Sequence, residues 1–227
     1  IAEYLSLARA LGKLLPNELP SYVRPLKAAF LGSYTIQGLG EVCASQGVFH
    51  NLFIQSYTAP YNQFTQEVIN PESALAAFDP HLVYVLLDAP EVMDANHLQT
   101  VGHGLLEKTR AHIVFCTFVA GPHADKKYVA RLNACLHDLE KSENRISLFN
   151  FEGFLERRGA GHWYTKYKDL GDLRLAPNGF IPLSKELMAY AVAAAGNTKK
   201  CLVLDLDNTL WKGIIGEEGM TGIVPDH

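Results

Sequence analysis

Two aspartates separated by one residue directly follow an apolar stretch. The stretch 201–204 is typical of a buried strand, and Asp205 and Asp207 come at its end. Alternate residues of a strand point to the same face, so the two carboxylates share one side. Phosphoryl transfer to a carboxylate needs a nucleophile, a divalent cation and an acid for the leaving oxygen. We predict that Asp205 attacks phosphorus and binds the cation, while Asp207 protonates the leaving group and then activates water. The alternative is that the pair only caps the following turn.

The composition is that of an ordinary soluble protein. The 227 residues are 48% hydrophobic and 19% charged, with a formal net charge of -4. No basic face indicates nucleic-acid binding, no apolar run approaches the roughly 20 residues of a membrane span, and the start lacks a signal-peptide pattern. We therefore predict a cytoplasmic protein with no nucleic-acid and no membrane partner. The cysteines lack C-x-x-C spacing and the histidines lack the spacing of a zinc hydrolase, so we expect neither a disulfide framework nor a zinc site.

Apolar periodicity alternates between strands and helices along most of the chain. Helical spacing runs from Ile1 to Leu15 and ends at Pro16. Continuous apolar runs then predict parallel strands that are covered on both faces. The expected strands are 27–31, 52–54, 82–87, 112–118 and 146–149, and the expected helices end at Val42 or cover 72–78, 97–108, 126–141 and 184–195, the last with Ser184 as N-cap and Gly196 as its stop.

This alternation predicts an α/β fold with a doubly wound, three-layer parallel sheet. Ligands of such sheets bind beyond the carboxyl ends of the strands. The positions to inspect there are Ser33, Thr35, 55–62, Asp88 and 119–122. The stretch 159–182 has no clear period and predicts a long loop.

A polar joint at 197–200 precedes the next buried strand. We therefore divide the chain into an N-terminal helical segment at 1–25, the α/β domain at 26–198 and the beginning of a further domain at 199–227.

The segment around the two aspartates resembles the haloacid dehalogenase superfamily, whose first motif, D-x-D-x-T, is matched by Asp205, Asp207 and Thr209. The run 200–211 and the glycines that follow it look like the FkbH-like proteins of polyketide and related biosynthesis, with Lys212 where that family usually has glycine. The resemblance implies Mg²⁺ bound by Asp205 and by the backbone carbonyl of Asp207, with Thr209 supporting the loop. It also implies a Rossmann-like (Rossmannoid) domain of which 199–227 is only the truncated start, so we expect this fragment alone to be inactive.

FkbH-like proteins carry an N-terminal domain similar to SGNH, or GDSL, hydrolases, which have a flavodoxin-like sheet. Their G-D-S-x-T block is matched here at Ser33 and Thr35, and their D-x-x-H block is matched at Asp172, with Leu175 where the base is expected. A serine hydroxyl needs a general base within reach to react at neutral pH. Ser33 is therefore either a nucleophile served by another histidine, or a turn residue that hydrogen-bonds to its own backbone. The histidines that remain candidates for this base are His50, His123 and His162.

The resemblance implies that the whole protein removes phosphate from a small phosphorylated three-carbon donor such as bisphosphoglycerate and loads a glyceryl unit onto a phosphopantetheinylated acyl carrier protein. The first domain would be a platform for substrate or carrier protein. Two alternatives remain open: an SGNH-type esterase or acyltransferase centred on Ser33, and a non-catalytic module that binds the carrier protein. An acyl transfer through an enzyme thiol would make Cys201 a candidate acceptor, but its position about 13 Å before Asp205 in the strand favours a buried structural role.

Overall fold

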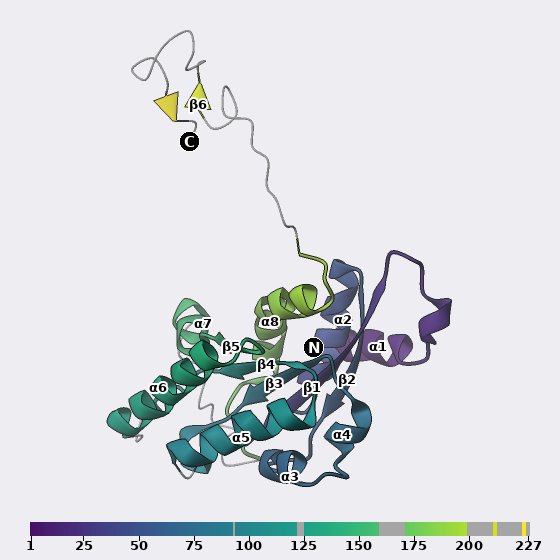
Figure 1. Cartoon of the computed structure of the whole chain (residues 1–227). Coiled ribbons are helices and arrows are strands. Elements are labelled where there is room, and N and C mark those ends of the chain that lie inside the picture. The colour runs from purple at the N-terminus through teal and green to yellow at the C-terminus, as the bar shows by residue number, and fades with distance from the viewer. Residues whose placement is uncertain (93, 122–124, 159–170, 199–210, 213–223, 226–227) are drawn as a thin grey trace. The chain divides into compact units, whose positions relative to one another are not determined.

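The computed structural model describes residues 1–92, 94–121, 125–158, 171–198, 211–212 and 224–225. The chain divides into two compact units, Ile1–Gly196 and Asn197–His227 (Figure 1). The described part of the second unit consists of residues 197–198 and a short antiparallel pair, β6 (Trp211–Lys212) and β7 (Val224–Pro225). Asp205, Asp207, Thr209 and Cys201 lie outside the described residues. What the sequence predicts for them, and for the domain limits at 25 and 198, stays a prediction.

A five-stranded parallel sheet forms the centre of the first unit. Its strands are β1 (Arg24–Gly32), β2 (Leu52–Thr58), β3 (Leu82–Leu86), β4 (His112–Cys116) and β5 (Ile146–Phe149). They lie in the order β2-β1-β3-β4-β5, and every neighbouring pair is parallel. This is the flavodoxin-like order, in which the chain reverses its direction of winding between β1 and β3. The crevice between the carboxyl ends of these two strands is therefore the expected place for a site.

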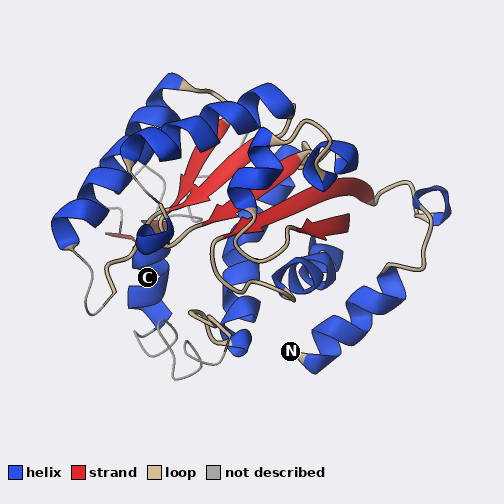
Figure 2. Ribbon diagram, turned by 90° about the horizontal axis from the view of Figure 1, so that it is seen from below, coloured by secondary structure: helices blue, strands red, loops and turns tan. Residues whose placement is uncertain are grey.

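Helices cover both faces of this sheet, which confirms the predicted three-layer α/β fold (Figure 2). Alternate residues of each strand enter two separate cores, as the pleat requires. One core lies under α1 (Ala2–Leu11), α2 (Leu39–Gly47), α7 (Phe151–Arg158) and α8 (Phe180–Ala194). The other lies under α3 (Phe64–Ile69), α4 (Ala74–Phe78), α5 (Ala95–Lys108) and α6 (Lys126–Ser142). Short 3₁₀ helices cover Pro16–Glu18, Val48–His50, Ala89–Glu91 and Pro177–Gly179.

The predicted start of the last helix, with Ser184 as N-cap, is wrong. Helix α8 begins at Phe180, and the hydroxyl of Ser184 lies inside it, donating to the carbonyl of Ile181 at 2.8 Å. Pro182 is tolerated because backbone N–H groups in the first turn have no acceptor within the helix. The predicted stop is confirmed, since Gly196 follows the helix with φ +72°, a conformation that favours glycine.

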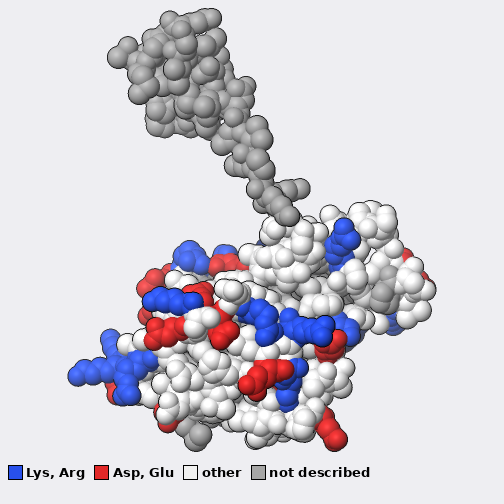
Figure 3. All heavy atoms as spheres, viewed as in Figure 1, with Lys and Arg blue, Asp and Glu red and all other residues white. Residues whose placement is uncertain are grey.

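Charged side chains of both signs are interspersed over the face of the first unit shown in Figure 3. Among the residues that the structure describes, every helix is too short or too polar to pass through a lipid bilayer.

Candidate functional site

The crevice at the carboxyl ends of β1 and β3 brings Ser33 beside Asp88. The backbone N–H of Ser33 donates to the carbonyl of Leu86 at 3.1 Å, and the Ser33 hydroxyl oxygen accepts from the backbone N–H of Asp88 at 2.8 Å. Ser33 is completely buried. Its hydroxyl therefore joins the ends of two neighbouring strands and is not accessible from solvent.

Glycine precedes this serine, at a position where the GDSL block has aspartate. A Cβ at Gly32 would lie 2.8 Å from Cδ1 of Ile36 and 3.1 Å from the carbonyl oxygen of Tyr34. The turn after β1 is too tight to hold a larger residue without displacing Ile36. Glycine in place of the aspartate of the GDSL block thus allows close packing of Ile36 and Tyr34 beside Ser33.

A buried ion pair occupies the crevice next to Ser33. One carboxylate oxygen of Asp88 accepts from the backbone N–H of Ala89 at 2.9 Å, and the other contacts Nη1 of Arg174. The side chain of Asp88 is 1% exposed and that of Arg174 is 6% exposed. Nε of Arg174 also donates to Asp172 at 2.7 Å. Burial lowers the pKa of the Arg174 guanidinium, and the Tyr61 and Tyr34 side chains oppose this shift.

The segment around Asp172 is tied to the first strand and to its loop. The backbone N–H of Thr35 donates to the carbonyl of Asp172 at 3.2 Å, and its hydroxyl donates to the carbonyl of Gly171. The Tyr61 hydroxyl donates to the Asp172 carboxylate at 3.0 Å. Asp172 has φ +51°, which aspartate tolerates better than most residues. The fold therefore brings together the three candidates Ser33, Thr35 and Asp172.

The position where an SGNH hydrolase has its base is part of the hydrophobic core. Leu175 is completely buried in the core under α8, where a Cβ on Gly179 would meet it at 3.0 Å. His50 lies just before β2, at the amino ends of the strands, since Leu52 pairs with Arg24 at the start of β1. A strand of nine residues, or about 30 Å, separates those ends from Ser33, so His50 is not its base. His123 and His162 lie outside the described residues.

Arg174 is the site residue that the sequence did not assign. Asp88 was marked as a strand-end position, and Arg174 stands inside the block that was compared with D-x-x-H. The usable signal was an arginine directly before Leu175, the position where the base was expected. The sequence did not indicate Asp88 as the partner of Arg174, because the two residues are far apart along the chain.

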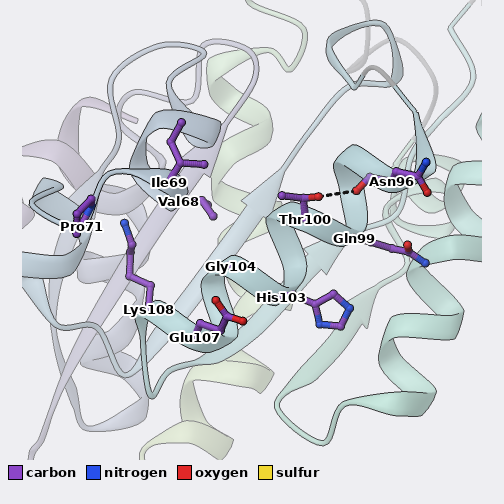
Figure 4. Close-up of a pocket in the computed structure, with 10 residues that line it drawn as sticks. All are labelled: Val68, Ile69, Pro71, Asn96, Gln99, Thr100, His103, Gly104, Glu107 and Lys108. Carbon is purple, nitrogen blue, oxygen red and sulfur yellow. Dashed lines mark hydrogen bonds between the residues drawn. The ribbon is translucent and has the colours of Figure 1, made fainter.

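A separate groove of the first unit lies away from this crevice. It has a volume of about 800 Å³ and runs between α3 and α5, lined among others by Ile69, His103 and Lys108 (Figure 4). None of its lining residues belongs to the crevice around Ser33.

The described parts of the chain hold no group of three or more histidine, cysteine or acidic side chains that would bind a metal ion. The predicted magnesium ligands Asp205 and Asp207 are not among these residues, so the magnesium site stays a prediction.

The described cysteines are structural. Burial raises the pKa of the Cys43 and Cys116 thiols well above their usual value, and it also raises that of Cys135. The reactive form of cysteine is the thiolate, so these side chains are poor nucleophiles.

A Cys201→Ala variant is therefore expected to react with a chromogenic disulfide reagent more than about 100-fold more slowly in its native state than in denaturant, because only unfolding exposes the three remaining thiols. The absorbance of the released thiolate measures the rate. Rapid native reaction of all three thiols would contradict the buried environment of Cys43 and Cys116.

Comparison with known proteins defines the class of fold. No protein-family model matches the chain, and no curated protein sequence matches it. Over 79% of its length the chain is similar to a GDSL-like lipase from Parabacteroides merdae, of which it covers 100%, with a TM-score of 0.54 and 14% identity. Over 76% it is similar to the esterase EstA from a Pseudoalteromonas species, of which it covers 99%, with a TM-score of 0.53 and 12% identity. The first unit thus has the fold of GDSL-like esterases.

A further solved structure is similar over almost the whole chain. It is the N-terminal part of the protein BF1531 from Bacteroides fragilis, which contains a phosphatase domain and is complexed with Mg. The match covers 98% of this chain with a TM-score of 0.71 and 20% identity. The chain spans 65% of that structure, which is less than two thirds of its length. BF1531 and the esterases are therefore similar to this chain at the level of fold.

Proposed function

We propose that the chain belongs to an FkbH-like protein, in which a non-hydrolytic SGNH-like domain precedes the start of a magnesium-dependent phosphotransferase domain. The observation that carries this proposal is the similarity over 98% of the chain to a protein part that contains a phosphatase domain. The D-x-D-x-T motif at Asp205, Asp207 and Thr209 supports it independently. The substrate would be a phosphoglycerate-type donor, and the acceptor of the glyceryl unit would be a phosphopantetheinylated acyl carrier protein.

In this proposal Asp205 and Asp207 divide the chemistry. The Asp205 carboxylate attacks phosphorus and forms an acyl phosphate, while Asp207 gives a proton to the departing oxygen. Asp207 then takes a proton from water, which attacks phosphorus, releases inorganic phosphate and restores Asp205. Mg²⁺ held by Asp205 and by the Asp207 carbonyl would shield the approach of the two negative groups.

The crevice around Ser33 supports a binding role for the first domain. An esterase needs an accessible nucleophile and a base, whereas Ser33 is buried against Asp88 and Leu175 replaces the expected histidine. We assign this domain to recognition of the substrate or the carrier protein.

The loading reaction tests the proposal. The protein continued past His227 is incubated with bisphosphoglycerate, Mg²⁺ and the phosphopantetheinylated carrier protein, and intact masses of both proteins are recorded. A glyceryl adduct on the carrier supports the proposal. Phosphate release without an adduct would leave only the phosphatase, and the absence of both would overturn it.

A Ser33→Ala variant separates this proposal from the esterase alternative. It is expected to leave any hydrolysis of a chromogenic short-chain ester unchanged and to lower the free energy of unfolding by about 1–3 kcal/mol, because the buried N–H of Asp88 loses its acceptor.

Ser184→Ala is the matched control, since Ser184 is equally buried but its hydroxyl donates to a helix carbonyl. Its loss leaves no N–H without an acceptor, and a smaller effect on unfolding is expected. Ester turnover that disappears in Ser33→Ala and persists in Ser184→Ala would establish Ser33 as a nucleophile.

A further inference from the structure

A basic pocket lies at the amino ends of the strands, whereas Ser33 lies at their carboxyl ends. His81 immediately precedes β3, His112 is the first residue of β4, and Arg145 immediately precedes β5. These strands start in register, because Leu82 pairs with His112 and Ile113 with Ile146. The pocket, which we call the amino-edge pocket, has a volume of about 400 Å³ and is lined by Asp79, His81, Arg110, His112 and Arg145, among others.

Arg145 is held rigidly at this edge. Its guanidinium donates to the carbonyls of Leu106 at 2.6 Å and of Thr109 at 2.7 Å, which satisfies acceptors at the end of α5. A guanidinium has five N–H donors in a fixed plane. Nη1 also donates to the carbonyl of Ala111 at 3.4 Å, whereas Nε makes no hydrogen bond with the described residues, so part of this planar donor set is left for a ligand.

The two histidines present defined hydrogen-bonding atoms. Nδ1 of His81 accepts from the backbone N–H of Lys27 at 3.0 Å, so the neutral ring carries its proton on Nε2 and donates there. Nε2 of His112 lies 2.8 Å from the hydroxyl of Ser147. Burial and the charge of Arg145 both lower the pKa of His112, which favours the neutral ring.

The charge of the pocket favours an anion. Arg110 and Arg145 are cationic, and Asp79 is the one carboxylate among the lining residues that the structure describes. Arg110 is exposed and has neither a hydrogen bond nor an ion pair with the described residues, so its charge is available to a ligand. Cations at this edge also offset the carbonyl ends of the helices, but Arg145 already does this for α5.

We propose that the amino-edge pocket binds a phosphate group, either as inorganic phosphate or as a phosphate monoester. Guanidinium groups match the paired oxygens of phosphate, and the pocket offers two of them, one held by backbone carbonyls and one exposed. This inference does not depend on the proposed function, because it concerns the opposite ends of the strands.

Binding is tested by NMR on the 227-residue chain, with the imidazole resonances of the histidines followed as inorganic phosphate is added at constant ionic strength. Saturable shifts of His81 and His112 are expected, while His103 and His137, which lie elsewhere, stay unshifted. A second titration with glycerol phosphate distinguishes the free anion from the monoester, since the form that belongs to the site saturates at lower concentration.

Arg110→Gln is expected to weaken this binding by at least about tenfold, because a charged hydrogen-bond donor is lost. Arg131→Gln is the matched control, since Arg131 is equally exposed but lies on α6, outside the pocket. The proposal is overturned if neither anion shifts His81 and His112 saturably, if all histidines shift alike, or if the two variants bind equally.

Discussion

Replacement of Arg174 by methionine is expected to lower the free energy of unfolding by about 3–5 kcal/mol, the usual effect of removing one partner from a buried ion pair. The Asp88 carboxylate is 1% exposed, so without the guanidinium it stays charged in a poorly solvated place or takes up a proton. Asp172 loses its contact with Nε as well. At about 2–4 °C for each kcal/mol in a domain of this size, the melting temperature should fall by roughly 6–20 °C.

The double variant Asp88→Asn with Arg174→Met tests the cause of this loss. The amide of asparagine keeps an oxygen for the N–H of Ala89 but carries no charge, so we expect the double variant to be more stable than Arg174→Met alone. Denaturant unfolding of both variants measures the difference. Arg131→Met, an exposed change on α6, should stay within about 0.5 kcal/mol of the parent. A double variant that is less stable than Arg174→Met would show that the uncompensated charge is not the reason.

The sheet was largely predictable because its strands are continuous apolar runs. The strand expected at 146–149 is β5 as observed. Strand β2 extends to Thr58, four residues beyond the expected end, because the residues after Ile54 are only half-buried and polar ones are allowed there. Helices α3 and α7, of six and eight residues, were not predicted, whereas the five-residue α4 lies within the helix expected at 72–78. Pro182 delayed the expected start of α8, although a proline fits the first turn.

The site was predictable only as far as single positions. The ends of β1 and β3 marked Ser33 and Asp88, since both directly follow apolar runs. Their hydrogen bond, and the ion pair of Asp88 with Arg174, depend on the strand order and on the return of the chain after α7. Neither leaves a periodic trace in the sequence. The residues around Leu175 do not indicate whether another base or a packed crevice replaces the missing histidine. The observed ion pair and the buried Leu175 favour the packed crevice.

Asp205→Asn is expected to reduce phosphate release by at least about 10³-fold in the protein continued past His227, because an amide does not attack phosphorus. Asp207→Asn is the informative companion. It loses the acid and the base but keeps the nucleophile, so a slow first step is followed by an even slower hydrolysis. Intact mass should show one added phosphoryl group on Asp207→Asn and none on Asp205→Asn.

Ser33→Ala serves as the matched control for both carboxylate variants. It changes the first unit and leaves the D-x-D-x-T motif intact, so phosphate release should persist at temperatures where the variant is folded. Asp205→Asn that still releases phosphate would remove the phosphotransferase assignment, whatever the carrier protein does. If folded Ser33→Ala also fails to release phosphate, the crevice around Ser33 contributes to the reaction, because this variant leaves Asp205 and Asp207 unchanged.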